Sequence, residues 1–318
     1  MGPTLRKTPI VVITGPTAVG KTRLAVEVAK QVPVEIISAD SRQIYRKMDI
    51  GTGKPTPAQR RIAPHHLIDI LAPDESFSAA DFAKQARHAI ERIAKKGKLP
   101  IVVGGTFLYL KALLFGFFEA PGRSDEIRAR LRAEAERFGG GRLHKMLSKI
   151  DPEAANTIHP NDHVRLIRAL EVYETTGRTV SELKREQASR GGSIFADTIF
   201  ALTMPRDALR ANIEQRVDEM FAVGFVEEVR SLLDAGYDRS LSSFSSLGYQ
   251  QVADLIHGKL TLSQAIERTK TQTWRYAKKQ VSWLKQNWGF EFINAQDDHA
   301  NITKVSDRCK KLLQPVSS

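Results

Sequence analysis

The eight residues GPTAVGKT constrain the fold of this chain more than any other part of its sequence. They match the pattern G-x-x-x-x-G-K-[ST] and lie between an apolar run at residues 10–14 and a helical pattern at residues 23–30. Such a P-loop binds a di- or triphosphate, because its backbone N–H groups and the dipole of the following helix face the anion. The predicted anion-binding residues are Gly15, Pro16, Thr17, Ala18, Val19, Gly20, Lys21 and Thr22, with the Thr22 hydroxyl as the expected Mg²⁺ ligand.

Short apolar runs alternate with helical patterns in the first third of the chain, which predicts a parallel sheet with helices on both faces. The runs that read as strands are residues 10–14, 34–38, 67–71 and 101–103, and residues 79–96 read as a helix. Strand patterns then stop, and one returns at residues 198–203. We predict an α/β fold, with a P-loop NTPase-like core of residues 1–115 and 195–318 that ends in helices. An all-helical insertion of residues 116–194 is expected to interrupt this core.

The charge balance favours a polyanionic partner, because 48 basic residues against 36 acidic ones give a net charge of +12. A lone cysteine, Cys309, cannot form an intrachain disulfide, and such a sequence suits a reducing cytoplasm. No run approaches the roughly 20 apolar residues that span a bilayer, so we expect no membrane association. A monomer is the simplest expectation for the oligomeric state.

The strand end that carries an acid in many P-loop enzymes lacks one here. Nucleotide-hydrolysing members usually end a second strand in an Asp that helps to hold Mg²⁺. The strand pattern at residues 101–103 instead runs into Gly104, Gly105 and Thr106. Asp69 lies inside the pattern at residues 67–71, where we expect a structural or peripheral role. This departure weakens an ATPase or GTPase interpretation.

The strand pattern at residues 34–38 leads into a polar segment that begins at Asp40. Its carboxyl end should open at the same sheet edge as the P-loop, where ligands of open α/β sheets bind. An Asp in that place can take a proton from a nucleophile, but it can equally cap a turn or a helix. Spacing alone leaves both roles open for Asp40.

Six further blocks and the P-loop form an ordered set that covers most of the chain, from about residue 10 to residue 288. The blocks are DSRQIYRKMDIGTGKP, VGGTFLYLKAL, DPEAANTIHPNDHVRLIRALEVYETTGRT, RVDEMFAVGFVEEV, SLGYQQ and RYAKKQVSWLK. This set resembles the tRNA dimethylallyltransferases, in their bacterial form because one cysteine leaves no zinc-finger tail. The whole set is far more specific than the P-loop alone.

The resemblance implies an enzyme that transfers a dimethylallyl group from dimethylallyl diphosphate to N6 of the adenosine 3′-adjacent to the anticodon in tRNA. The products are N6-isopentenyladenosine and diphosphate, and Mg²⁺ is the implied cofactor. The P-loop then holds a leaving group, and a C–O bond breaks rather than a P–O bond. Machinery for a γ-phosphate, including the missing strand-end acid, is not needed for that reaction.

Individual roles also follow from the resemblance. Asp40 is implied as the general base near N6, Lys21 as a stabiliser of the leaving diphosphate, and Thr106 as a neighbour of the substrate. Arg216 is the expected diphosphate clamp, whereas Asn212 stands where the family usually has an arginine, and we expect no role for it. The residues implied in tRNA binding are Asp40, Ser41, Arg42, Gln43, Thr106, Arg128, Val164, Arg165, Leu166, Ile167 and Arg168.

Residues 274–288 contain all three tryptophans and no acid. At about 100° per residue, one helical face would carry Trp274, Ala277, Val281, Leu284 and Trp288. We expect this face to belong to the core rather than to stack on bases. The basic residues beside it, Arg275, Lys278 and Lys279, are the better candidates for contacts with tRNA phosphates.

Two other functions remain compatible with the composition and the P-loop. One is a small-molecule kinase that binds ATP in the loop and uses Asp40 to activate a hydroxyl. The other is a non-enzymatic, ATP-dependent RNA-binding switch. The missing strand-end acid and the basic residues favour prenyl transfer, and the resemblance decides for it.

Overall fold

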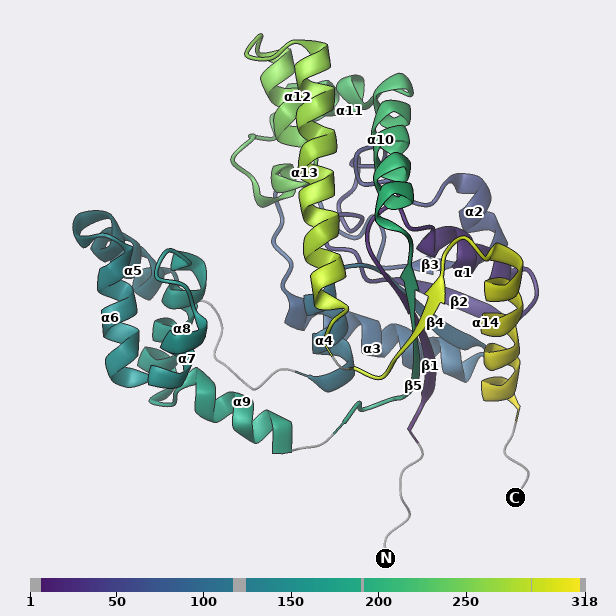
Figure 1. The fold of residues 1–318 in the computed structure, drawn as a ribbon, viewed down its shortest axis with the longest axis horizontal. Helices are drawn as coiled ribbons and strands as arrows, with labels where there is room; N and C mark the ends of the chain where they lie inside the picture. The colour runs from purple at the N-terminus through teal and green to yellow at the C-terminus, as the bar shows by residue number, and fades with distance from the viewer. Residues whose placement is uncertain (1–6, 117–123, 190–191, 287, 315–318) are drawn as a thin grey trace, which may run out of the picture. The chain divides into compact units, whose positions relative to one another are not determined.

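The computed structural model describes residues 7–116, 124–189, 192–286 and 288–314. The chain forms two compact units (Figure 1). The sheet unit comprises Met1–Leu114 and Ile194–Ser318, and the helical unit comprises Phe115–Ser193. Each unit has a buried apolar core of its own.

Six parallel strands in the order β3-β2-β4-β1-β5-β6 form the sheet, which confirms the predicted α/β fold class. The strands are β1 Pro9–Thr14, β2 Val34–Ser38, β3 His65–His66, β4 Leu99–Val103, β5 Ala196–Thr203 and β6 Phe290–Asn294. Successive residues of β1 from Ile10 to Ile13 are all buried completely. Helices cover both faces of a parallel sheet, so its central strands are apolar throughout instead of alternating.

The helices of the sheet unit cover both faces of the sheet and extend beyond the carboxyl ends of its strands. They are α1 Lys21–Ala29, α2 Pro57–Ile62, α3 Ala79–Lys95, α4 Phe107–Phe115, α10 Arg206–Ala222, α11 Phe225–Asp234, α12 Tyr249–Ile256, α13 Leu262–Trp283, α14 Asp298–Leu313 and the 3-10 helix η1 Ser242–Ser245. Helices α1 and α14 pack on one face of the sheet, and α3 packs on the other. Helices α10 and α13 lie side by side beyond the carboxyl ends of the strands (Figure 1).

The strand predicted at residues 67–71 is wrong. Strand β3 consists of only His65 and His66, and beyond it Leu71 forms one isolated bridge to Tyr45. Leu67 and Asp69 have φ values of 61° and 58°, in the left-handed region, so the backbone cannot continue as a strand. Asp69 turns toward Lys54 and Arg60 instead, in accord with the structural role expected for it.

The apolar face predicted for residues 274–288 is only partly correct. Helix α13 ends at Trp283, so Trp288 lies beyond it, and Val281 is 42% exposed. The rings of Trp283 and Trp288 both pack against Phe107, with centroids 5.9 and 6.1 Å away. These indoles belong to an aromatic cluster of the protein, which supports a core role over base stacking.

The helical unit contains α5 Asp125–Phe138, α6 Gly140–Ile150, α7 Pro152–Thr157, α8 His163–Thr176 and α9 Val180–Ser189. Its core is formed by leucines such as Leu131, Leu143 and Leu170. A carboxylate, Glu171, is also fully buried there and pairs with Arg128 and Arg168. Burial acts to raise the pKa of Glu171, but these charge-assisted bonds outweigh it and lower that pKa to about 2.

Among the residues that the structure describes, no helix is both long enough and apolar enough to cross a membrane.

Candidate active site

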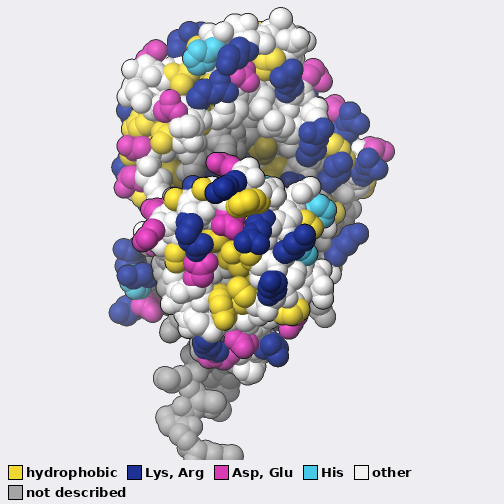
Figure 2. All heavy atoms as spheres, turned by 90° about the vertical axis from the view of Figure 1, so that its left-hand side faces the viewer, with side chains coloured by type: hydrophobic (Ala, Val, Ile, Leu, Met, Phe, Trp, Pro, Cys, Tyr) yellow, Lys and Arg dark blue, Asp and Glu magenta, His cyan; other side chains and the backbone are white. Residues whose placement is uncertain are grey.

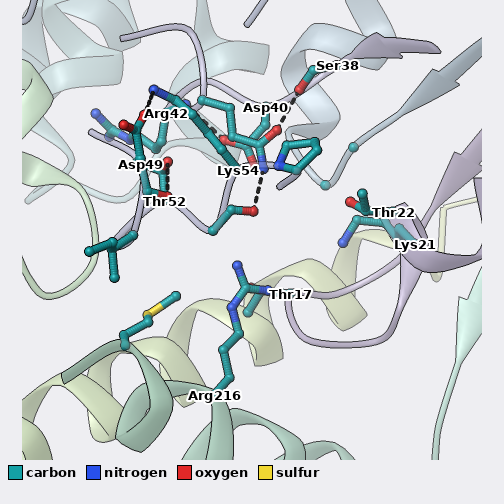
Figure 3. A pocket seen from close by; sticks show the side chains of 18 of the residues that line it. Thr17, Lys21, Thr22, Ser38, Asp40, Arg42, Asp49, Thr52, Lys54 and Arg216 are labelled. Atoms are coloured by element: carbon teal, nitrogen blue, oxygen red, sulfur yellow. Dashed lines mark hydrogen bonds and ion pairs between the residues drawn. The ribbon is translucent and has the colours of Figure 1, made fainter. Parts of the chain in front are cut away.

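A pocket of about 1530 Å³ opens at the carboxyl ends of β1, β2 and β4 in the sheet unit (Figure 3). The P-loop forms one wall, and the segment from Ser38 to Arg61 forms another. Helices α10 and α13 contribute Arg216, Tyr276 and Gln280 to the remaining wall. The pocket therefore lies where an open α/β sheet binds its ligands.

The P-loop presents backbone donors that take no acceptor among the residues the structure describes. Its left-handed residues are Ala18, with φ 62°, and Gly20, with φ 96°. Gly15 is required by space, since a Cβ there would lie 2.7 Å from the carbonyl oxygen of Leu202. Within the described part of the chain, no acceptor takes the N–H groups of residues 18–22. A row of free N–H groups at the start of α1 is an anion-binding site.

Two cations point into the pocket beside these donors (Figure 3). Lys21 donates to the carbonyl oxygens of Gly15 and Pro16, at 3.1 and 2.7 Å. Burial lowers the pKa of Lys21 to about 8, with the charge of Arg216 acting in the same direction and that of Asp40 against it. Burial also lowers the pKa of Arg216, and Asp40 again opposes the shift. The site thus holds more positive charge than its own acids compensate.

Arg216 is seated on a glycine. A Cβ on Gly53 would overlap Nη2 of Arg216, so no other residue type leaves the guanidinium in place. Gly53 also has a φ of 59°, which favours glycine independently. The carbonyl oxygen of Gly53 accepts a hydrogen bond from Gln43 at 3.2 Å. The GTG stretch of the sequence therefore positions the predicted diphosphate clamp.

Two charged side chains that sequence reasoning missed hold this segment in place. Glu228 of α11 accepts the N–H groups of Asp49, Ile50 and Gly51 at 2.7 to 3.1 Å. The ammonium of Lys54, with its side chain 2% exposed, donates to the carbonyl oxygen of Tyr45 and to the carboxylates of Asp49 and Asp69. Both lie in blocks that carried the family resemblance, but nothing in their local sequence indicates these distant partners.

Asp40 makes the bond expected of a turn cap, whereas its role as a general base stays a prediction. Its Oδ1 accepts the N–H of Arg42 at 2.8 Å, which is a capping bond for the turn that follows β2. In the described residues, Oδ2 has no protein partner, and Asp40 lines the same pocket as Lys21 and Arg216 (Figure 3). One oxygen therefore fixes the loop, and the other is available to a ligand.

The residues predicted to act beside Asp40 form hydrogen bonds to different parts of the protein. The Thr106 hydroxyl accepts the N–H of Ser41 at 3.1 Å, so the loops after β2 and β4 are joined. The guanidinium of Arg42 donates to Ser242 and Ser245 of η1. Gln43 is 9% exposed and bridges Ser38 to Gly53, so it braces the wall of the pocket more than it presents a free amide.

Helix α13 lines the pocket with a polar face that the sequence analysis did not identify. Thr269, Thr273, Tyr276 and Gln280 recur at helical spacing and all line the pocket. Burial raises the pKa of Tyr276 to about 12, and the charge of Asp40 adds to this effect. Its hydroxyl therefore stays protonated and can donate a hydrogen bond. The periodicity of these polar residues was the available signal.

The site fits a Mg²⁺ ion that is bound mainly through a ligand. The Thr22 hydroxyl lines the pocket and has no protein partner among the described residues. No group of three or more His, Cys, Asp or Glu side chains suited to hold a metal occurs in that part of the chain. Mg²⁺ commonly keeps several waters and takes few protein ligands beside phosphate oxygens, so one hydroxyl is sufficient.

The tRNA-binding residues predicted outside the loops after β2 and β4 fall into two groups. Arg275, Lys278 and Lys279 are exposed on α13. In the helical unit, Val164 is 81% exposed and the Arg165 side chain 67%. Leu166 and Ile167 are instead buried in the core of that unit, and their side chains do not face solvent. Arg128 and Arg168 are engaged by Glu171, which limits what they can offer to a partner.

Three comparisons with known proteins agree on one family. The model of the IPP transferase family matches residues 43–287. The tRNA dimethylallyltransferases of Thermotoga petrophila and Geobacter sulfurreducens are 45% and 42% identical, over 96% and 94% of this chain and 97% and 96% of their own. A tRNA isopentenylpyrophosphate transferase structure from Bacillus halodurans has a TM-score of 0.70 at 38% identity, covering 97% of each chain. A structure of a eukaryotic dimethylallyltransferase acting on tRNA has a TM-score of 0.79 at 29% identity, covering 95% of this chain and 77% of that one.

The lowered pKa of Lys21 predicts a pH dependence of anion binding. With a pKa of about 8, Lys21 loses its charge above that pH in the ligand-free protein, whereas a bound anion restores it. Pyrophosphate affinity should therefore fall as the pH rises above 8, by up to about tenfold per unit, with proton uptake on binding. Calorimetry in buffers of different ionisation enthalpy measures both quantities. Lys21→Met keeps only the titration of pyrophosphate itself, so equal pH profiles would contradict the assignment.

Gly53→Ala should weaken pyrophosphate binding by about tenfold or more, because the new methyl group displaces the guanidinium of Arg216. Gly97→Ala is the matched control: Gly97 also has a left-handed φ, 69°, but no atom lies within 4 Å of its would-be Cβ. Both variants share the cost of a left-handed φ, Gly53→Ala adds the cost of the overlap, and only Gly53→Ala should lose affinity. In an Arg216→Gln background Gly53→Ala should add little; a full additive loss would dissociate Gly53 from Arg216.

Proposed function

The chain belongs to the IPP transferase family, and we propose on that premise that it transfers a dimethylallyl group from dimethylallyl diphosphate to tRNA. The acceptor is N6 of the adenosine 3′-adjacent to the anticodon. The observation that supports this most directly is that one pocket holds the P-loop, Lys21, Arg216 and Oδ2 of Asp40. Neither this oxygen nor the N–H groups of residues 18–22 have a protein partner within the described part of the chain. A leaving anion and a departing proton require these two opposite charges in one place.

The P-loop in this proposal stabilises a leaving group. The bond between the allylic carbon and the diphosphate oxygen breaks, and the electron pair stays on the diphosphate. The N–H groups of residues 18–22, with Lys21 and Arg216, stabilise the negative charge that develops on that oxygen. Because these donors are already oriented, no reorganisation accompanies the transfer.

Asp40 acts on the other substrate. N6 forms a bond to the allylic carbon, and the proton that it loses passes to Oδ2 of Asp40, which is free of protein partners among the described residues. The bond from Arg42 N–H to Oδ1 holds the carboxylate in a fixed orientation. Tyr276, protonated because its pKa is about 12, can donate a hydrogen bond within the same pocket.

Thr22 would hold Mg²⁺ together with oxygens of the diphosphate, and the ion would neutralise part of the charge of the leaving group. The adenine must leave its stack to reach Asp40, because a base within a helix is inaccessible to a carboxylate in a pocket. The pocket volume of about 1530 Å³ is large enough for an adenosine and a prenyl diphosphate together.

A kinase would need a further acid that this pocket does not offer at the usual place. Strand β4 ends at Val103 and is followed by Gly104 and Gly105, and the nearby Asp69 is occupied by Lys54 and Arg60. The kinase hypothesis and the RNA-binding switch both also lack support from the family to which the chain belongs. Cytoplasmic localisation and a monomeric state remain expectations from the sequence.

For tRNA contacts we propose the exposed basic residues of α13, Arg275, Lys278 and Lys279, and in the helical unit Val164 and Arg165. Figure 2 shows Lys and Arg side chains spread over one face of the molecule, with acidic side chains between them. Arg128 and Arg168 are assigned mainly to the internal pairing with Glu171. Contacts of the exposed cations with phosphates would position tRNA without reading its sequence.

Incubation of the protein with dimethylallyl diphosphate, Mg²⁺ and unmodified tRNA should add one five-carbon unit to N6 of the proposed adenosine, detected by mass spectrometry of the nucleosides. Asp40→Asn should lower kcat by about 100-fold or more, because its amide still accepts the Arg42 N–H but takes no proton. Its tRNA affinity should persist, and the exposed Asp74→Asn should match the unchanged enzyme. ATP turnover or a phosphorylated acceptor without prenylation would instead favour the kinase.

Lys279→Ala should reduce the slope of log affinity for tRNA against log salt concentration by about one, since one phosphate contact is lost. Arg165→Ala should have the same effect in the helical unit. Lys95→Ala is the control, because this exposed lysine ends α3 near the amino ends of the strands, whereas the pocket lies at their carboxyl ends. Filter binding between low and moderate salt measures the slopes. A variant with an unaltered slope does not contact phosphate.

A further inference from the structure

Two side-chain amides grip the P-loop, and the proposed reaction assigns neither of them a role. Gln280 of α13 accepts the N–H of Thr17 with Oε1 at 2.8 Å and donates from Nε2 to the carbonyl oxygen of Gly105 at 2.9 Å. Asn212 of α10 donates from Nδ2 to the carbonyl oxygen of Ala18 at 3.3 Å. From the sequence we expect no role for Asn212, but this hydrogen bond to the P-loop gives it one to test.

The two bonds bracket the one strained residue of the loop. Ala18 has a φ of 62°, a conformation that its Cβ disfavours and that glycine adopts freely. Such a conformation persists only where the surroundings impose it. Fixing the N–H of Thr17 and the carbonyl oxygen of Ala18 sets the direction of the chain on both sides of this φ angle. The loop then turns its next N–H groups, those of residues 18–22, toward the pocket.

Gln280 is built into its position. It is 4% exposed, and a Cβ on Gly105 would overlap its Nε2, so the glycine after β4 is what lets the amide approach. The next residue, Thr106, accepts the N–H of Ser41 beside Asp40. One side chain thus ties the P-loop to the turn after β4, and through it to the loop that carries Asp40.

We propose that Gln280 and Asn212 are positioning residues, an amide clamp that holds Ala18 in its left-handed conformation and so keeps the anion seat formed. The clamp deepens the proposed function, because the anion there is the diphosphate of the donor. Neither amide needs to touch substrate. Their effect on the reaction passes through the backbone of Thr17 and Ala18 and, for Gln280, through the spacing between the P-loop and Asp40.

Inorganic pyrophosphate with Mg²⁺ is a probe of the seat that does not depend on prenyl transfer. Asn212→Ala and Gln280→Met should each weaken its binding by about tenfold, as expected for the loss of one or two positioning hydrogen bonds. Ala18→Gly alone is the reference of the cycle, because glycine adopts the same φ without help. In that background Asn212→Ala should cost less than about threefold in affinity, compared with about tenfold when Ala18 is present.

The double-mutant cycle separates positioning from a merely structural role. Rescue by Ala18→Gly supports the clamp, whereas equal losses in every background would overturn it. Gln272→Met, an exposed amide of the same helix, should leave pyrophosphate binding unaltered. Thermal unfolding shows whether Gln280→Met folds. If it does not, the cycle of Asn212→Ala with Ala18→Gly tests the clamp by itself, because Asn212 is only half-buried.

The outcome for the clamp is distinguishable from that for the proposed function. Rescue without prenylation of tRNA would leave the clamp and remove the transferase assignment. Prenylation of tRNA without rescue by Ala18→Gly would support the transferase assignment and overturn the clamp. A protein that does not bind pyrophosphate at all would overturn both. In the transferase assay, Gln280→Met should lower kcat more than Asn212→Ala does, because only Gln280 also sets the position of the acceptor side.

Discussion

Uncompensated positive potential at the carboxyl end of β1 is the constraint on which the rest of the site depends. The free N–H groups of residues 18–22, Lys21 and Arg216 all face one pocket. Burial without an anion lowers the pKa of both cations, and only Asp40 acts against this for both residues. A ligand with two or more negative charges relieves that cost, so the same feature that destabilises the ligand-free site would supply affinity for the proposed diphosphate.

Glycines allow the elements around this potential to approach closely. A Cβ on Gly53 would overlap Arg216, one on Gly105 would overlap Gln280, and one on Gly104 would overlap the carbonyl oxygen of Ala39. The loop after β2 therefore approaches α10 and the loop after β4, and the loop after β4 approaches α13, at distances that other residues forbid. This explains in physical terms why the blocks DIGTG and VGGT accompany the P-loop in the sequence.

Sequence patterns predicted the elements whose structure depends mainly on neighbouring residues. The P-loop, β1, β2, β4 and the long helix α3 are clear in the sequence because their apolar periodicity and turn residues are short-range signals. The strand predicted at residues 67–71 does not form, because Leu67 and Asp69 are left-handed and Asp69 pairs with Lys54 and Arg60, which a short apolar run does not reveal. Leu166 and Ile167 were predicted to bind tRNA because they lie in a block that resembles the family, but α8 places their side chains in the core of the helical unit.

The pocket face of α13 could not be inferred from hydrophobicity, since a helix that lines a polar site places polar residues inward. Thr269, Thr273 and Gln280 are each less than a tenth exposed, whereas the apolar Val281 is 42% exposed. The partners are also distant in sequence: Gln280 binds Thr17 across 263 residues, and Glu228 binds Asp49 across 179. Such pairs depend on the completed fold, and no local motif encodes them.

The glycine pair after β4 connects the chemistry to the architecture. In a phosphoryl-transfer enzyme, an acid near this strand end helps to hold the metal at the reacting phosphorus. When the breaking bond is C–O, both phosphorus atoms stay intact, and the site needs charge stabilisation without in-line geometry at phosphorus. The strand end is then free for another use. Here Gly104 and Gly105 admit Ala39 and Gln280, which align the loop carrying Asp40 with the anion seat. A carboxylate at Gly105 would collide with Gln280 and place a negative charge against the proposed diphosphate, so the acid and the clamp exclude each other.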